Sequence, residues 1–191
     1  MSTSGVIKAW KTIGEEEVAD CRIFQLRRVR RRHPDLSLEG AFYYMATTDW
    51  VNVVAVTDSA HLVLVRQYRH GTDEVTLEIP GGILDEGETP IEGARRELIE
   101  ETGFVPGRLR VIGRVRSNPA IVDNWTWTVL ATELTATDGI APDEHEDIAV
   151  ELHRVADIDE LLRTGVITHA LVIDAFMWYR LEMGAAHDSP A

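Results

Sequence analysis

One segment near the middle of this chain of 191 residues constrains its fold more than any other, because both of its ends carry helix-capping residues. Thr89 has a side chain suited to cap a helix N-terminus, and Pro90 suits the first helical position. Glu92 lies where the acid of a capping box belongs. Gly103 can adopt the left-handed conformation that ends a helix. The pattern therefore predicts a helix over residues 90–102.

Acidic side chains crowd one side of this predicted helix. At about 100° per residue, one stripe faces the core, formed by Ile91, Ala94, Leu98 and Thr102. Glu97 and Glu101 lie beside that stripe, and Glu100 follows just beyond it. Such like charges repel by about 0.2–0.5 kcal/mol per pair on a free helix. Arg96 can pair with one carboxylate, that of Glu100, which leaves the others, including Glu88, without a counter-charge. We therefore expect a divalent cation with oxygen ligands, and the alternative is a solvated charged helix face.

The remaining pattern predicts an α/β domain. Strands are expected at 21–30, 41–46, 51–56, 62–65, 77–79, 108–115 and 125–131, and further helices at 156–163 and 170–183. The apolar runs 51–56 and 62–65 flank a turn-like segment, which favours a hairpin of buried strands. Six arginines lie between residues 22 and 32. They indicate either an edge strand kept soluble by charge or a contact to an anionic ligand or partner subunit.

Composition excludes several classes of function. The formal net charge of −13 disfavours binding to nucleic acids and to anionic membranes. Cys21 is the only cysteine, so an intrachain disulfide framework and a zinc site of several thiolates are excluded. The N-terminus has no signal-peptide pattern, and no apolar run approaches the roughly 18 residues of a membrane helix. We expect a cytoplasmic protein with no membrane partner.

The spacing of the acidic helix and its flanks can be written as a motif. The chain reads Gly82-x5-Glu88-x7-Arg96-Glu97-Leu98-x-Glu100-Glu101-x-Gly103-Phe104. This resembles the Nudix box, and only Phe104 is unusual, since that place is more often aliphatic. The resemblance implies a Nudix-type α/β/α sandwich with a mixed central sheet, plus an N-terminal antiparallel β-sheet region. The expected division is an N-terminal β region over 1–48, a Nudix hydrolase domain over 49–184 and a polar tail over 185–191.

The resemblance also implies the chemistry: a metal-polarised water attacks one phosphorus of a nucleoside diphosphate linked to another group. It assigns Mg²⁺ or Mn²⁺ to oxygen ligands, namely Glu97, Glu101, Glu100 and the main-chain carbonyl of Gly81. Glu88 and Arg96 would orient the ligating carboxylates. The acidic run Asp143–Ile148 resembles a loop whose first glutamate serves as catalytic base, which implies Glu144 as base and Glu146 as auxiliary ligand. Glu100 is a further candidate base, and a solvated acidic turn is the alternative for the loop.

Sequence outside the box resembles the branch that cleaves ADP-ribose and nucleotide sugars. The resemblance rests on Val65–Arg69 and Leu77–Gly82, with a proline, Pro119, placed as in that branch. Substrate contacts are expected from Arg69 first, then from Arg66, Glu78, Pro119 and Trp125. Trp125 shares a strand face with Trp127, so the pair either stacks on a base or sugar or packs in the core or a subunit interface. The tripeptide Asn118–Ala120 departs from the usual Ser-Pro-Gly, which makes GDP-sugars as plausible as ADP-ribose.

Other functions stay open within and outside this branch. The chain could act on dinucleoside polyphosphates or another nucleoside diphosphate derivative, or it could bind nucleotides without cleaving them. The complete set of box glutamates favours an enzyme. By analogy with the branch we also expect a homodimer, formed through the N-terminal sheet with its arginines and Trp10. The histidines show no ligand spacing and are interpreted as incidental, including His61, His70, His145 and His169.

Overall fold

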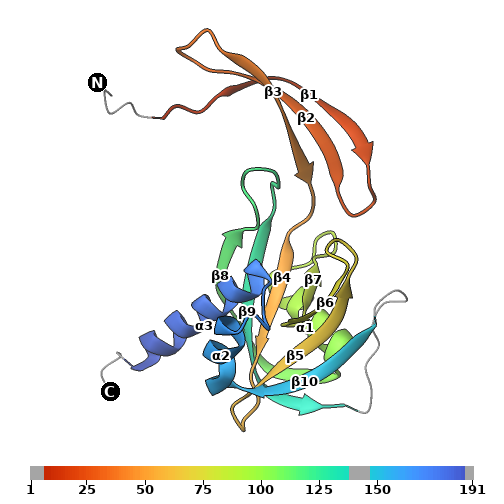
Figure 1. The fold of residues 1–191 in the computed structure, drawn as a ribbon, viewed down its shortest axis with the longest axis vertical. Helices are drawn as coiled ribbons and strands as arrows, with labels where there is room; N and C mark the ends of the chain where they lie inside the picture. The colour runs from red at the N-terminus through yellow and green to blue at the C-terminus, as the bar shows by residue number, and fades with distance from the viewer. Residues whose placement is uncertain (1–6, 138–146, 188–191) are drawn as a thin grey trace. The chain divides into compact units, whose positions relative to one another are not determined.

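The computed structural model describes residues 7–137 and 147–187 of the chain (Figure 1). The chain divides into two compact units. One unit comprises residues 1–48 and 116–124, and the other comprises residues 49–115 and 125–191. The short segment 116–124 therefore belongs with the N-terminal region, although it lies far from it in sequence.

The first unit contains a three-stranded antiparallel sheet. Its strands are β1 (Lys11–Asp20), β2 (Gln25–Arg32) and β3 (Glu39–Ala46), in the order β1-β2-β3. The arginine-rich strand β2 pairs on both sides, with β1 and with β3. The interpretation of this segment as an edge strand was therefore wrong.

The neighbouring strands explain why so many arginines can lie in the centre of a sheet. The guanidinium of Arg27 contacts Glu15 at 2.9 Å, and that of Arg28 contacts Glu16 at 2.9 Å, both across to β1. Arg32 pairs with Glu39 of β3. Exposed pairs of this kind each contribute about 0–1 kcal/mol. Their main effect is to neutralise like charges that would otherwise repel along β2.

The second unit holds two sheets and the helices. Its strands are β4 (Trp50–Ala55), β5 (His61–Arg69), β6 (Glu74–Glu78), β7 (Gly81–Ile83), β8 (Phe104–Arg116), β9 (Trp125–Ala136) and β10 (Ile148–Arg154). One sheet has the order β7-β4-β9-β8 and is mixed, because β4 runs parallel to β9 and antiparallel to β7. The other has the order β10-β5-β6 and is antiparallel.

The helices are α1 (Pro90–Thr102), the 3₁₀ turn η1 (Val155–Asp157), α2 (Ile158–Arg163) and α3 (Ala170–His187). The predicted helix over 90–102 is confirmed with the same bounds. Its capping box joins Thr89 and Glu92, and Gly103 ends it with a φ of 70°. In the described residues, no helix is long and apolar enough to cross a membrane.

The expected hairpin between 51–56 and 62–65 was wrong. β4 and β5 lie in different sheets, and only an isolated bridge joins Val56 to Leu62. Both runs are apolar, except for Asn52, because both faces of each strand are covered. A run of this kind predicts burial, but it does not identify the strand that pairs with it.

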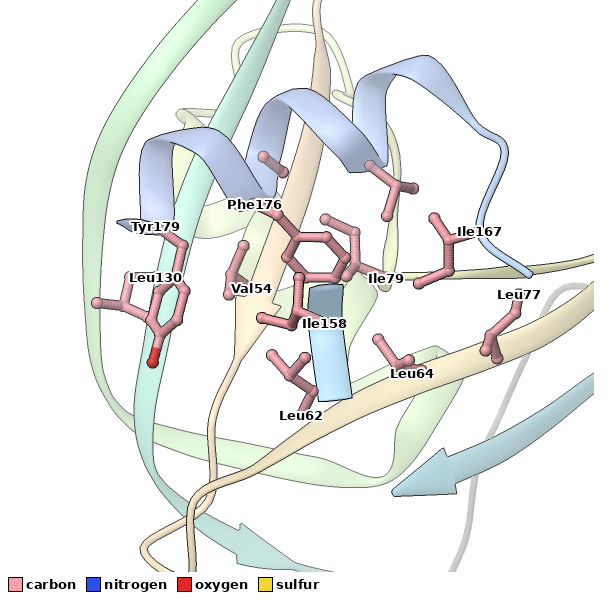
Figure 2. Packing of buried hydrophobic residues seen from close by; sticks show 12 residues of the cluster. Val54, Leu62, Leu64, Leu77, Ile79, Leu130, Ile158, Ile167, Phe176 and Tyr179 are labelled. Atoms are coloured by element: carbon pink, nitrogen blue, oxygen red, sulfur yellow. The ribbon is translucent and has the colours of Figure 1, made fainter. Parts of the chain in front are cut away.

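Alternate residues of β4 face opposite layers of the second unit. Val51 and Val53 pack in one cluster with Leu98 of α1. Val54 packs in the other cluster, with residues of α2 and α3. Figure 2 shows Phe176 and Tyr179 directed from α3 toward the strands. Helices thus cover both sides of the mixed sheet, which confirms the expected α/β/α sandwich.

Candidate active site

Two glutamates of α1 approach the glycine loop at β7. The side chain of Glu101 is buried, and its Oε2 accepts a hydrogen bond from the Gly81 N–H at 2.9 Å. A Cβ atom added to Gly82 would lie 2.3 Å from Oε1 of Glu97, so only glycine permits this approach. Burial of Leu98 fixes the rotation of the helix and thereby directs both glutamates toward the loop. The loop Gly81-Gly82 and these two carboxylates form one compact group of oxygen and amide groups.

Arg96 holds more carboxylates than the sequence analysis expected. Its Nη1 donates to Glu97 at 2.8 Å and to Glu100 at 3.2 Å. Its Nε and Nη2 donate to the two oxygens of Glu88 at 3.0 and 2.9 Å, and Nη2 also donates to the Ile83 carbonyl at 3.0 Å. The expectation that this guanidinium pairs with one carboxylate was wrong, because its five N–H groups fan out between the helix and the loop.

This network shifts the ionisation of its members. The hydrogen bonds from Arg96 lower the pKa of Glu88, and the Asp85 N–H adds to the effect. Glu88 in turn raises the pKa of Arg96 above its ordinary value. Glu88 and Arg96 therefore stay charged at neutral pH, and Arg96 acts as the counter-charge of the acidic group.

The residues around the loop suit a hard divalent cation in the kind of atoms they offer. Glu97, Glu101 and the main chain of Gly81 supply oxygen donors, which are the ligands that Mg²⁺ prefers, usually together with water and substrate phosphates. Within the part of the chain that the structure describes, no group of three or more His, Cys, Asp or Glu side chains is arranged to hold a metal. We infer that substrate or water oxygens would have to complete such a site.

A cavity of about 520 Å³ adjoins the glycine loop. The residues that line it and that concern its chemistry are Trp50, Asn52, Arg69, Glu78, Gly81 and His169. Arg69 donates to both oxygens of Glu78, at 2.9 and 2.8 Å, and Thr76 donates to Glu78 at 2.6 Å. Burial alone would raise the pKa of Glu78, but these hydrogen bonds outweigh it and hold the pKa below its ordinary value. The cavity therefore contains a fixed carboxylate and a partly exposed guanidinium.

Arg66 lies away from this cavity. Its position on β5 differs by three from that of Arg69, so the two side chains project from opposite faces of the strand. Arg66 pairs with Glu151 of β10 at 2.6 Å, and His153 contacts the same carboxylate at 2.9 Å. These two partners lower the pKa of Glu151 to about 2.

The remaining predicted substrate contacts are distributed elsewhere. Trp125 lies under the guanidinium of Arg114, 4.3 Å from the ring centroid, and Trp127 lies 4.8 Å from the same group. Asp49 fixes this arrangement, since it accepts from the Trp125 main chain and from Trp127 Nε1, both at 2.9 Å. Pro119 belongs to the first unit, where it lines a separate cavity of about 460 Å³.

The predicted base Glu144 and the predicted auxiliary ligand Glu146 lie outside the described residues. Two further residues line the cavity: Asn52, which the sequence analysis did not name, and His169, which it interpreted as incidental. Asn52 donates to the Leu171 carbonyl at 3.1 Å and so joins β4 to the start of α3. The one signal for His169 in the sequence was its place directly before a predicted helix, where a residue can face a ligand.

Comparison with known proteins places this geometry in a family. The model of the NUDIX domain matches residues 47–176. An ADP-ribose pyrophosphatase of Bacillus subtilis is 32% identical over 133 residues, which span 69% of this chain and 72% of that protein. An ADP-ribose pyrophosphatase of Mycobacterium tuberculosis is 30% identical over 170 residues, spanning 86% of this chain and 80% of that protein.

A solved structure agrees with these sequence relatives. The crystal structure of an ADP compounds hydrolase superimposes with a TM-score of 0.85 at 25% identity and covers 96% of this chain and 98% of that one. The domain match includes the glycine loop, the capped helix and the start of α3. The chain therefore belongs to the NUDIX domain family and is a Nudix hydrolase that resembles the ADP-ribose pyrophosphatases.

Proposed function

We propose that this enzyme hydrolyses the diphosphate bond of ADP-ribose or of a related nucleoside diphosphate sugar, giving a nucleoside monophosphate and a sugar phosphate. The observation that carries the proposal is the position of Glu97 and Glu101 against the loop Gly81-Gly82, at the edge of a cavity that also contains Arg69. Two relatives named ADP-ribose pyrophosphatase and a solved ADP compounds hydrolase support the choice of substrate.

Each residue of the proposed site has a distinct task. Arg69 would bind the diphosphate, because a guanidinium matches phosphate oxygens in shape and charge. Glu97, Glu101 and the Gly81 carbonyl would hold a divalent cation, Mg²⁺ or Mn²⁺, with Glu100 and Glu146 as further ligands. When bound, that cation would neutralise charge on the phosphoryl oxygens. Arg96 and Glu88 would keep the ligating carboxylates oriented, because Arg96 donates to both Glu88 and Glu97.

The reaction itself exchanges one P–O bond for another. The oxygen of a water molecule attacks one phosphorus, the bond from that phosphorus to the bridging oxygen breaks, and the bridging oxygen leaves with the second phosphate. Glu144 would take the proton of the attacking water. We expect Glu144→Gln to lower kcat by about 10²–10⁴-fold with little change in KM, since only the transition state loses an interaction. A nearly normal kcat would transfer the role to Glu146 and then to Glu100.

The products formed in ¹⁸O-labelled water test the proposal directly. Purified enzyme with Mg²⁺ should convert ADP-ribose to AMP and ribose phosphate, with label on only one of the two, as read by mass spectrometry. Excess chelator should stop the reaction. Glu97→Gln should raise the Mg²⁺ concentration needed for turnover, whereas Glu160→Gln on the exposed side of α2 should not. Release of free ribose and intact ADP would mean cleavage of the ester bond between the ribose and the diphosphate and would refute the proposal.

The identity of the sugar and of the base is tested by the same assay with other substrates. ADP-glucose, GDP-mannose and diadenosine polyphosphates should be compared with ADP-ribose at equal concentration. A dinucleoside polyphosphate with the highest kcat/KM of the set would replace the proposed substrate class.

We also propose that the enzyme is a cytoplasmic homodimer joined through the sheet β1-β2-β3. Light scattering of the full chain and of an N-terminal sheet variant would test the dimer.

A further inference from the structure

One wall of the cavity beside the glycine loop comes from outside the Nudix box. Residues 168–171, at the start of α3, line the same cavity as Gly81 and Arg69. We propose that His169, in this wall, accepts a hydrogen bond from a hydroxyl of the substrate's sugar and thereby sets the preference for sugar-linked diphosphates. This inference rests on the proposed function, because it names the residue that recognises one end of the same substrate.

The imidazole of His169 turns one nitrogen inward and leaves the rest of the ring partly exposed. Its Nδ1 is buried and has no hydrogen-bond partner among the described residues, and it lies 3.7 Å from Oε2 of Glu78. The side chain as a whole is 38% exposed. Since Nδ1 is the buried nitrogen, the accessible edge of the ring carries Nε2. No described residue hydrogen-bonds to Nε2, so this nitrogen is available to a ligand in the cavity.

The neighbouring carboxylate determines which hydrogen bond this nitrogen can make. Glu78 is charged, because Arg69 and Thr76 stabilise its ionised form. A negative charge close to Nδ1 favours the tautomer that carries its proton on Nδ1. In a neutral imidazole the other nitrogen is then an acceptor. In this neutral form Nε2 of His169 accepts a hydrogen bond from a donor such as a hydroxyl, and it does not suit a phosphate oxygen.

The other polar groups of the cavity show what a ligand meets beside His169. Arg69 and His169 both approach Oε2 of Glu78, at 2.8 and 3.7 Å, so a sugar attached to a diphosphate held by Arg69 would lie against the imidazole. The cavity is also lined by Glu74, a further acceptor that forms no ion pair with a described residue. Acceptors repel phosphate and attract hydroxyl groups. The sugar attached to the diphosphate is the part of the substrate that carries several hydroxyls.

A pair of substrates separates this role from a general effect on catalysis. ADP-ribose and the ethyl ester of ADP contain the same kind of diphosphate bond, but the ester has no hydroxyl on its leaving side. His169→Leu removes both ring nitrogens at similar bulk. We expect it to lower kcat/KM for ADP-ribose by about 5–10-fold, the value of one hydrogen bond, and to leave the ester within about twofold of wild type. His169→Asn, which keeps a hydrogen-bonding side chain, should recover part of the loss.

Two controls keep the result interpretable. His153→Leu alters a histidine on β10 that contacts Glu151 and does not line the cavity. This variant should therefore leave kcat/KM unchanged for both substrates. Thermal unfolding should confirm that His169→Leu is folded. An equal loss on both substrates, or no loss on either, would overturn the inference.

Binding measured without turnover separates this inference from the proposed function. In chelator, isothermal titration calorimetry should detect ADP-ribose binding to wild type, weakened by about 5–10-fold in His169→Leu. If wild type binds ADP-ribose in this way but never cleaves it, the proposed function fails and the inference stands. If wild type cleaves ADP-ribose and His169→Leu binds it as tightly as wild type, the inference fails and the proposed function stands.

Discussion

Replacing Arg96 by methionine tests whether this residue is the internal counter-charge of the acidic helix. The side chain of Arg96 is 28% exposed, and those of its partners Glu88 and Glu97 are each 13% exposed. Methionine keeps the length of the aliphatic stem and removes every N–H group. The substitution leaves the carboxylates of Glu88, Glu97 and Glu100 without their shared cation.

The size of the effect follows from this partial burial. Removing one partner of a fully buried ion pair costs about 3–5 kcal/mol, because the other charge is left unpaired. Water still reaches the site, so the lower end of that range applies, and we expect a loss of about 3 kcal/mol in the free energy of unfolding. For a protein of this size each kcal/mol corresponds to about 2–4 °C, which gives a decrease in Tm of about 6–12 °C.

The assay compares wild type and Arg96→Met in chelator and in Mg²⁺, by urea unfolding and by thermal unfolding. A cation that binds only the folded state stabilises it in proportion to the logarithm of its concentration over its Kd. In the variant Mg²⁺ no longer competes with a guanidinium for Glu97. The difference in unfolding free energy between wild type and variant should therefore become smaller when Mg²⁺ is added. A difference below about 1 kcal/mol in chelator, or a difference that Mg²⁺ leaves unchanged, would refute the reasoning.

Local rules predicted the part of the fold that local interactions build. The bounds of α1 follow from Thr89, Glu92 and Gly103, all of which act within one turn of the helix. The same segment holds the box glutamates, so most of the predicted metal group could be located from spacing alone. The role of Arg96 as the counter-charge could not be predicted from spacing. Its hydrogen bonds to Glu88 and to the Ile83 carbonyl join the helix to the loop before it.

Pairing between strands was much less accessible to sequence reasoning. The apolar run of β4 is consistent with any buried neighbour, and its partner β9 lies more than seventy residues later in the chain. The arginines of β2 predicted an edge strand, but Glu15 and Glu16 of β1 pair with Arg27 and Arg28, so β2 can occupy the centre of the sheet. Arg66 and Arg69 lie beyond the predicted strand 62–65 but within β5, where residues three apart project from opposite faces, so the two cannot share one site.

The cavity wall from α3 illustrates the same limit for the site. His169 is about ninety residues away from the loop that it faces, and a single histidine has no spacing by which to recognise it. Only the packing of Phe176 and its neighbours on the sheet places the start of α3 beside β6 and β7. Site residues delivered by such packing need the fold before they can be assigned.

Three further substitutions test the electrostatics of the second unit. Glu151→Gln should cost about 1–2 kcal/mol at pH 7, after allowance for a side chain one-third exposed, as urea unfolding would measure. The pKa of Glu151 in the folded protein is lowered to about 2, so the loss of stability should be complete above about pH 4.5 and should disappear as the pH falls toward 2. A loss of stability that does not depend on pH would contradict this prediction. Arg114→Ala should cost about 1–2 kcal/mol by loss of two cation–π contacts and should shift tryptophan fluorescence, whereas unchanged stability and emission would show that the stacking contributes nothing. Glu101→Gln keeps an oxygen that can accept from the Gly81 N–H but removes a buried charge beside Glu97, so the Tm in chelator should hold or rise while kcat with Mg²⁺ falls by orders of magnitude. A Tm several degrees lower in chelator would instead assign the Glu101 carboxylate to the stability of the fold.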